Sequence, residues 1–344
     1  MAKYYFNLPP ITQLTISQQA ALYETKQIAL SGGPGTGKSV VSLWRHISNF
    51  EKNKKSILLT YTTTLKMYLS ECCTNSLAAI NVKTSLRGRP QNGIGLHEVI
   101  VDEAQDLPVN YYEELKHVAK VSYSADDSQI LYPEKCSYQR DLKRVFPNNV
   151  NCVLDKNFRS TQRIMQFAKQ AFNEAYIPYS TISNLSNNIG ELPIMLISDG
   201  NRFERTNDKQ NNSILEIIQS FRSDTHNIAI LVPWKSEALV FEDIIKDSID
   251  DYSIYYEDST RFPNGCEPIK NVHITTFKSA KGLEFDTVII PNFHRYKEVD
   301  TLPEHFHLKW NDYYVAVTRA RSNLYLITNN DMHEFSSLTY KSKL

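Results

Sequence analysis

The most specific chemistry in the sequence lies in a glycine-rich stretch near the N-terminus. Gly32, Gly37, Lys38 and Ser39 match the spacing G-x-x-x-x-G-K-[ST]. Glycines without a Cβ let backbone N–H groups converge on a phosphate, and the N-terminus of the following helix adds its dipole. In such a loop the lysine reaches the β- and γ-phosphates and the serine hydroxyl binds Mg²⁺. The stretch predicts a site for ATP and Mg²⁺, formed by Gly32, Gly33, Gly35, Thr36, Gly37, Lys38 and Ser39.

Two acids follow a later apolar run. Asp102 and Glu103 come directly after residues 98–101, which read as a buried strand. We expect Asp102 to help hold Mg²⁺ and Glu103 to polarise an attacking water. Two adjacent acids without such a role would be a poor end to a buried strand. Gln129, which follows the apolar residues 121–125, is expected to contact both the γ-phosphate and the water.

Two further groups flank these motifs. Gln18 precedes the glycine-rich loop, and its amide can pair with the donor and acceptor edges of adenine; taken alone, it would read as a surface glutamine on a helix that Ser17 caps. Tyr61 and Thr62 follow a buried strand at residues 57–60, where open α/β sheets bind ligands. They are candidates for a stacked base and a phosphate backbone, or for a plain loop with a packed tyrosine.

Strands and helices that alternate along the chain must position these residues. Apolar runs at residues 28–30, 57–60, 98–101, 121–125 and 151–154 are separated by helical patterns, which predicts a doubly wound, mostly parallel sheet. The composition becomes polar over residues 171–213, and a second series of strands follows. We therefore expect two α/β domains, at residues 1–165 and 166–344. Near the end, Asn311 is expected to cap a helix that continues through Arg321.

Composition limits the function classes. The 344 residues include 38 Lys and Arg and 38 Asp and Glu, so the net charge is zero and no overall positive charge indicates binding to nucleic acid. A local basic cleft is still compatible with a net charge of zero. The five cysteines have no metal-binding spacing and fit a reducing compartment. Without a signal peptide or a long apolar run, the sequence predicts a cytoplasmic protein.

Taken together and in order, the motifs resemble those of superfamily 1 helicases of the UvrD/Rep type. The resemblance runs from Leu14 to about Leu326. The matching segments are the Q-motif with Gln18, the Walker A loop, motif Ia at residues 60–64, the Walker B sequence at 102–106, motif III at 126–129, motif IV at 157–160, motif V at 281–285 and motif VI at 314–321.

This resemblance implies two tandem RecA-like domains and further ATP-binding residues. Phe158 would stack on adenine, and Arg159 and Arg319 would place guanidinium groups on the γ-phosphate. Glu284, next to Gly282 in motif V, would hold the ribose. Fixed cations around the phosphates suit the charged transition state of phosphoryl transfer.

The resemblance also implies a motor that moves along single-stranded nucleic acid, DNA more than RNA, in the 3′ to 5′ direction. Candidate contacts with the strand are Tyr61, Thr62, Thr84, Tyr132, Thr276 and Lys278. By fold-level analogy, such a protein would act in DNA repair or antiviral defence, beside a nuclease.

The sequence departs from the family at three places. Residues 64–102 leave room only for a short helix and a loop, and residues 159–276 are filled by the second core domain, so both accessory domains of the family are expected to be missing or reduced to loops. Tyr132 is followed by Pro-Glu-Lys-Cys in place of an aromatic-Arg segment, and Lys278 replaces a histidine. These changes leave the ATP site complete but affect the segments with which the family unwinds duplexes, so the resemblance does not extend to duplex unwinding. An alternative function remains open: an ATP-driven regulatory switch that gates a partner nuclease without helicase activity.

Overall fold

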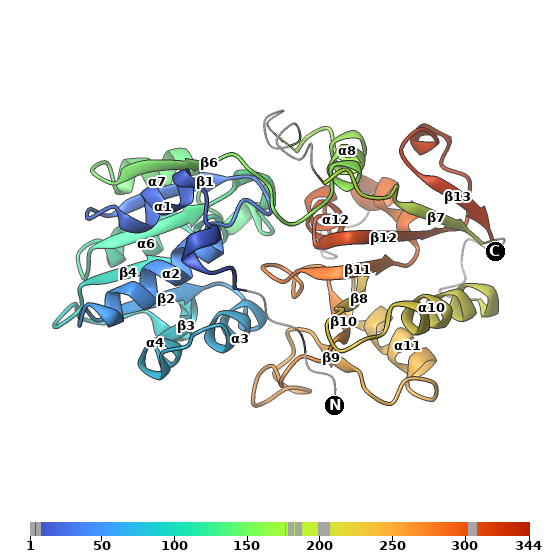
Figure 1. Ribbon diagram of the computed structural model, residues 1–344, viewed down its shortest axis with the longest axis horizontal. Coiled ribbons are helices and arrows are strands. Elements are labelled where there is room, and N and C mark those ends of the chain that lie inside the picture. The colour runs from blue at the N-terminus through green and yellow to red at the C-terminus, as the bar shows by residue number, and fades with distance from the viewer. Residues whose placement is uncertain are drawn as a thin grey trace. The chain divides into compact units, whose positions relative to one another are not determined.

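The computed structural model describes Tyr4, residues 8–175, Ile177, Ile182 and residues 188–198, 207–301 and 308–344. The chain divides into two compact units (Figure 1). The N-terminal unit is Phe6–Phe158, and the C-terminal unit is Arg159–Leu344 together with Met1–Tyr5. The junction between them lies within motif IV, slightly ahead of the boundary at residues 165 and 166 expected from the sequence.

The described part of the N-terminal unit contains one six-stranded sheet with the order β3-β2-β4-β5-β1-β6. Every ladder in this sheet is parallel. Parallel neighbours require helical crossovers, which explains the alternation seen in the sequence. The strands are β1 Ile28–Gly32, β2 Ser56–Thr60, β3 Val82–Thr84, β4 Glu98–Val101, β5 Val121–Ala125 and β6 Val150–Leu154.

Helices cover both faces of this sheet. Alternate residues of each strand point to opposite faces, so that Leu58 of β2 packs in one apolar cluster and Ile57 and Leu59 pack in another. The first cluster includes side chains of α2, α3 and α4, and the second includes side chains of α6 and α7. The helices are α1 Ile16–Tyr23, α2 Lys38–Glu51, α3 Thr63–Glu71, α4 Ser76–Ile80, α5 Ser85–Gly88, α6 Val109–Leu115 and α7 Gln139–Val145.

The described residues of the C-terminal unit form a seven-stranded sheet with the order β13-β7-β12-β11-β8-β10-β9, again with parallel ladders throughout. The strands are β7 Ile194–Ile197, β8 Ile228–Val232, β9 Ser253–Tyr255, β10 Val272–Thr276, β11 Phe285–Ile290, β12 Ala320–Thr328 and β13 Tyr340–Lys343.

The two faces of the second sheet differ in chemistry. Aliphatic residues of α10 (Asp208–Phe221) and α11 (Lys235–Ile245) pack on one face. Aromatic rings gather around α8 (Gln162–Ala171) and α12 (Trp310–Val317), where Phe167 packs against Phe293 and Phe335. Because each aromatic ring buries a large apolar area, these short helices cover this face of the sheet.

The predicted fold class is confirmed: both units are α/β structures with parallel, doubly wound sheets, as expected for RecA-like domains. Two local predictions are wrong. Thr15, not Ser17, caps α1, because its side chain accepts a hydrogen bond from the N–H of Gln18. The helix expected over residues 311–321 begins at Trp310, so Asn311 lies inside it and Lys309 is its N-cap. It ends at Val317, because Ala320 already pairs with Phe285 of β11.

Candidate nucleotide-binding site

The glycine-rich loop joins β1 to α2 in the predicted strand–turn–helix order. Gly37 has a φ of 87°, a left-handed conformation that disfavours residues with a Cβ. A Cβ on Gly37 would lie 2.4 Å from Nε2 of Gln18, and one on Gly32 would lie 2.5 Å from the Leu154 carbonyl oxygen. Close packing of backbone and side chains therefore requires glycine at both positions.

Lys38, the first residue of α2, folds back over this loop. Its Nζ donates to the carbonyl oxygens of Gly32 at 2.7 Å and Gly33 at 3.0 Å. It also lies 3.4 Å from Oδ2 of Asp126, and only 6% of its side chain is exposed. The ammonium group is thus held at the loop by neutral carbonyls and one carboxylate, which phosphate oxygens can replace.

Asp102 lies directly beyond β4 and is buried. One carboxylate oxygen accepts a hydrogen bond from the Ser124 hydroxyl, whereas Oδ2 is buried and accepts none within the described part of the chain. Burial, helped by the neighbouring Glu103 carboxylate, raises the pKa of Asp102 above its usual value, and the Ser124 and Ser39 hydroxyls and Lys38 only partly offset this. The Ser39 hydroxyl lies close enough to Asp102 to favour its charged form.

Ser39 and Asp102 are arranged as expected for the predicted Mg²⁺ ligands. A buried carboxylate oxygen without a partner, next to a hydroxyl, is a hard-oxygen donor set of the kind that Mg²⁺ takes together with substrate phosphates. A bound divalent cation would also remove the electrostatic cost of burying Asp102 beside Glu103.

Glu103 and Gln129 are linked through residues to which the sequence had assigned no role. Nε2 of Gln105 donates to Glu103 at 2.5 Å, and Oε1 of Gln105 accepts from the N–H of Asp126 at 3.1 Å. Oδ2 of Asp126 in turn accepts from Nε2 of Gln129 at 2.6 Å. Gln105 and Asp126 therefore connect the Walker B acids to motif III and Lys38. Gln105 lies in the Walker B segment and Asp126 in motif III, so their positions within these motifs could have indicated a role in the site.

The backbone of Glu103 is unusual. Its φ of 55° and ψ of 46° place a non-glycine residue in the left-handed region. Such strain costs about 1–3 kcal/mol and is concentrated at functional sites. The strain supports a functional role for the turn after β4.

Gln18 is buried against the glycine-rich loop and is not a surface residue. Its Oε1 accepts from the N–H of Thr15 at 2.9 Å, which completes a capping box, and its Nε2 donates to the Thr36 carbonyl at 2.9 Å. In this structure both ends of the amide that was expected to bind adenine are hydrogen-bonded to backbone. Adenine contact by Gln18 remains a prediction.

The first half of motif IV also holds the loop. Nδ2 of Asn157 donates to the Pro34 carbonyl at 3.0 Å, and the N–H of Phe158 donates to the Gly35 carbonyl at 2.8 Å. The Phe158 ring is 45% exposed, with Nζ of Lys156 at 5.2 Å from its centre. An exposed ring beside the loop is compatible with the predicted stacking on adenine. Asn157 is a loop contact that we had not assigned to the site.

The remaining predicted ATP residues lie together in the C-terminal unit. Nε of Arg159 donates to Glu284 at 2.9 Å, and Arg321 lies 3.9 Å from the other oxygen of the same carboxylate. Burial raises the pKa of Glu284, but Arg159 and Arg321 outweigh it and hold that pKa below its usual value. Gly282 adopts a φ of 84°, and the Tyr4 hydroxyl bonds to the Glu284 backbone.

Arg319 is fully buried beside this cluster. Its guanidinium donates to the carbonyls of Val315 at 2.9 Å and Leu283 at 3.3 Å, and to the Thr318 hydroxyl at 3.4 Å. These hydrogen bonds help to fix the position of the guanidinium group. Its predicted contact with the γ-phosphate remains a prediction.

Predicted nucleic-acid contacts fall into two groups. In the N-terminal unit the Tyr61 and Tyr132 rings lie 5.7 Å apart, Thr62 caps α3, and Thr84 ends β3 beside the end of β2. In the C-terminal unit Thr276 ends β10, where its hydroxyl donates to Ser279, and Lys278 follows two residues later. In each unit the candidates follow the carboxyl ends of parallel strands.

Two parallel α/β units, with a glycine-rich strand–turn–helix loop and two acids at the same sheet, have the architecture of a P-loop protein. Comparisons with known proteins narrow the class. The UvrD-like helicase C-terminal domain matches residues 246–331. A curated relative is R568 of Acanthamoeba polyphaga mimivirus, whose name proposes an ATP-dependent DNA helicase. The two sequences are 26% identical over 259 residues, and the alignment covers 68% of this chain and 34% of the relative. The chain thus spans about a third of that relative's length.

Solved structures show weaker similarity. The C-terminal domain of a possible DNA helicase from Lactobacillus plantarum is 20% identical, with 54% of this chain and 98% of that chain covered and a TM-score of 0.36. The PRRSV helicase is 13% identical, with 92% and 55% covered and a TM-score of 0.45. TM-scores below 0.5 mark both as distant. The domain match and the relative show that the chain is similar to UvrD-like helicases of superfamily 1.

Within the part of the chain that the structure describes, no helix has both the length and the apolar character needed to cross a membrane.

Proposed function

We propose that this protein is a Mg²⁺-dependent ATPase whose hydrolysis is coupled to binding of, and movement along, single-stranded nucleic acid, with DNA preferred to RNA. The observation that carries the proposal is the hydrogen-bonded network in the N-terminal unit. It joins the Walker A lysine, Asp126 and Gln129 of motif III, and Glu103 after β4. The residues lie beyond the carboxyl ends of β1, β4 and β5, which are neighbours in one sheet.

Each residue has a distinct task in this proposal. Lys38 exchanges the loop carbonyls for phosphate oxygens, and Ser39 and Asp102 hold the cation. Glu103 accepts a hydrogen bond from the attacking water, and Gln129 orients that water. Mg²⁺ would supply positive charge to the β- and γ-phosphates as negative charge develops in the transition state. By resemblance, Phe158 is assigned to adenine, Glu284 with Gly282 to the ribose, and Arg159 and Arg319 to the γ-phosphate.

The Tyr61–Tyr132 pair supports the nucleic-acid part of the proposal. Aromatic side chains stack on bases of any sequence, and hydroxyls bind phosphate oxygens. Thr62 follows β2 and Thr84 ends β3, the neighbour of β2 in the same sheet, and we assign both threonines to the phosphate backbone. Thr276 and Lys278 are the corresponding assignments in the C-terminal unit.

Steady-state ATPase rates with and without single-stranded DNA, and with RNA in parallel, test this proposal. We expect Mg²⁺-dependent hydrolysis that one polymer stimulates strongly. Lys38→Ala should lose ATP binding, whereas Glu103→Gln should lose hydrolysis and keep ATP bound. Lys54→Ala and Glu51→Gln are matched controls at exposed positions in the same unit. Full turnover by Glu103→Gln would remove Glu103 from the proposed role.

Polarity and unwinding need separate assays. Displacement of a strand from duplexes with 3′ or 5′ tails would test the 3′ to 5′ direction inferred from the family. Unstimulated hydrolysis would favour the second candidate, an ATP-driven switch that gates a partner nuclease. The observation in its favour is the equal number of cationic and anionic residues, 38 of each, which gives no general attraction for nucleic acid.

A further inference from the structure

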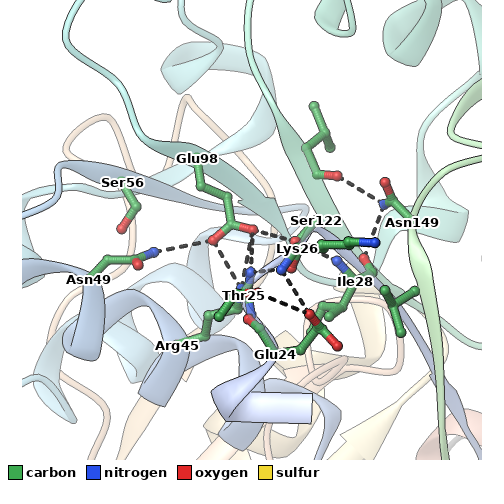
Figure 2. Close-up of polar contacts among 12 residues, drawn as sticks. Glu24, Thr25, Lys26, Ile28, Arg45, Asn49, Ser56, Glu98, Ser122 and Asn149 are labelled. Atoms are coloured by element: carbon green, nitrogen blue, oxygen red, sulfur yellow. Dashed lines mark hydrogen bonds and ion pairs between the residues drawn. The ribbon is translucent and has the colours of Figure 1, made fainter.

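A second buried polar network lies at the amino-terminal ends of the strands, away from the glycine-rich loop (Figure 2). Its centre is an ion pair between Arg45 of α2 and Glu98, the first residue of β4. Nε of Arg45 donates to both oxygens of Glu98, at 3.1 and 2.9 Å, and Nη2 donates to Oε1 at 2.9 Å. Arg45 is 5% exposed and Glu98 is fully buried.

The other polar atoms of the pair are also hydrogen-bonded. Arg45 donates to the carbonyls of Glu24 and Lys26, at 2.7 Å each, in the turn between α1 and β1. Glu98 accepts from Nδ2 of Asn49 at 3.2 Å and from the Ser122 hydroxyl, as the dashed lines in Figure 2 show. The pair thus joins α2, β4, β5 and the end of the helix that carries Gln18.

Stability alone is a poor explanation for such a pair. The cost of desolvating two charges often equals or exceeds their attraction, so apolar residues of similar size can be equally stabilising. A fork of parallel hydrogen bonds instead fixes geometry, because a guanidinium and a carboxylate fit in only a narrow range of positions.

The geometry that this fork fixes is the placement of α2 along β4. Lys38 and Ser39 begin α2, and Asp102 directly follows β4. Arg45 is about 10 Å along the helix from Lys38 at 1.5 Å per residue, and Glu98 is about 13 Å along the strand from Asp102 at 3.3 Å per residue. A slide of α2 by one residue would move Ser39 by about 1.5 Å, far beyond what the rigid coordination shell of Mg²⁺ tolerates.

We infer that Arg45 and Glu98 are positioning residues for the Mg²⁺–nucleotide site, setting the register of α2 against β4 so that Ser39 and Asp102 bind one cation. The inference rests on the Mg²⁺–nucleotide binding that the proposed function includes, and not on hydrolysis. It predicts that the pair matters for Mg²⁺-dependent binding more than for folding.

The test compares Arg45→Met/Glu98→Gln, which removes both charges and keeps similar volumes, with Arg45→Lys and the wild type. Arg144→Met is the matched control, because Arg144 forms an exposed ion pair with Asp141 at 3.5 Å and its side chain is 78% exposed. Thermal unfolding reports on folding. Equilibrium binding of a fluorescent ATP analogue, with Mg²⁺ and with EDTA, measures how strongly Mg²⁺ increases nucleotide affinity.

We expect the double variant to unfold cooperatively and to lose at least tenfold of the Mg²⁺-dependent increase in affinity. Arg45→Lys should lose about threefold, and Arg144→Met should match the wild type. A folded double variant whose Mg²⁺-dependent increase stays within twofold of wild type overturns the inference. If the double variant does not fold, Arg45→Lys decides: an unchanged Mg²⁺ effect in that variant overturns it equally.

Binding separates this inference from the proposed function. A wild-type protein that binds Mg²⁺–nucleotide but never hydrolyses it refutes the proposed ATPase and leaves the positioning test intact. A wild-type ATPase whose Mg²⁺ dependence survives loss of the pair refutes only the positioning role.

Discussion

Replacement of Asn157 by alanine would separate a loop-holding role from general stability. The Asn157 side chain is buried and donates to the carbonyl of Pro34, which is itself buried in the glycine-rich turn. Alanine leaves that carbonyl without its donor, which costs about 1–3 kcal/mol for a buried polar group.

This free-energy cost lowers nucleotide affinity because the variant changes the shape of the turn. In the free variant the turn relaxes until water satisfies the Pro34 carbonyl, and nucleotide binding then has to restore the original turn. If the full 1–3 kcal/mol is needed for this, affinity for ATP falls about 5- to 150-fold. A rise in Kd with an unchanged rate at saturating ATP is the expected signature.

The assay is equilibrium binding of a fluorescent ATP analogue, with urea unfolding measured on the same samples. Asn75→Ala is the control, because Asn75 caps α4 through the N–H groups of Leu77 and Ala78 and lies outside the proposed site. Loss of a cap costs about 0.5–2 kcal/mol, so both variants should lose similar stability. Equal Kd values for Asn157→Ala and Asn75→Ala, at equal stability, would refute the reasoning.

Four further predictions follow from local geometry. Gly37→Ala should abolish ATP binding, because the new Cβ would meet Gln18 at a φ of 87°; Gly95→Ala, at a φ of 73° with open space around it, controls for backbone strain alone. Gln18→Ala should weaken ATP and GTP binding equally if the amide only holds the loop, and should reduce selectivity for ATP over GTP if it reads adenine. Because burial raises the pKa of Asp102, protons should compete with Mg²⁺ at higher pH than for an exposed aspartate. The Mg²⁺ concentration for half-maximal binding should therefore rise as the pH falls below neutrality, with no such slope in Asp102→Asn. Burial lowers the pKa of His46 to about 4. The stability that the neutral ring contributes is therefore complete above about pH 6.5 and is lost as the pH falls through 4, by up to about 3 kcal/mol. Urea unfolding of His46→Gln over this pH range should show a smaller loss of stability with falling pH than the wild type.

The central strands of both sheets were predictable because each is a short apolar run between turn signals. The edge strands β3, β9 and β13 were not predicted. Each has only three or four residues and contains polar side chains, such as Lys83 in β3 and Lys341 in β13. They become strands because a neighbour supplies the hydrogen-bonding ladder, as when Thr84 pairs beside Thr60. Pairing of this kind depends on the sheet and not on local propensity.

The error in motif VI has a similar cause. Residues 311–321 have the apolar spacing of one helix, but the segment from Ala320 onward forms a long ladder with β11. Burial of a central strand outweighs the helical preference of a few residues at the end of a helix. Arg319 therefore lies in the turn between α12 and β12, with its N–H donating to the Ala316 carbonyl.

The sequence by itself determined the position of the glycine-rich loop, the acids after β4 and the resemblance to superfamily 1 helicases, because each motif is contained in a few consecutive residues whose chemistry is local. Only the tertiary structure decided which distant polar groups become partners. Asn157 meets Pro34, Gln105 meets Asp126 and Arg45 meets Glu98. Buried donors and acceptors must be satisfied, and the partner that lies within about 3 Å is set by the order of strands in the sheet, which no local pattern encodes.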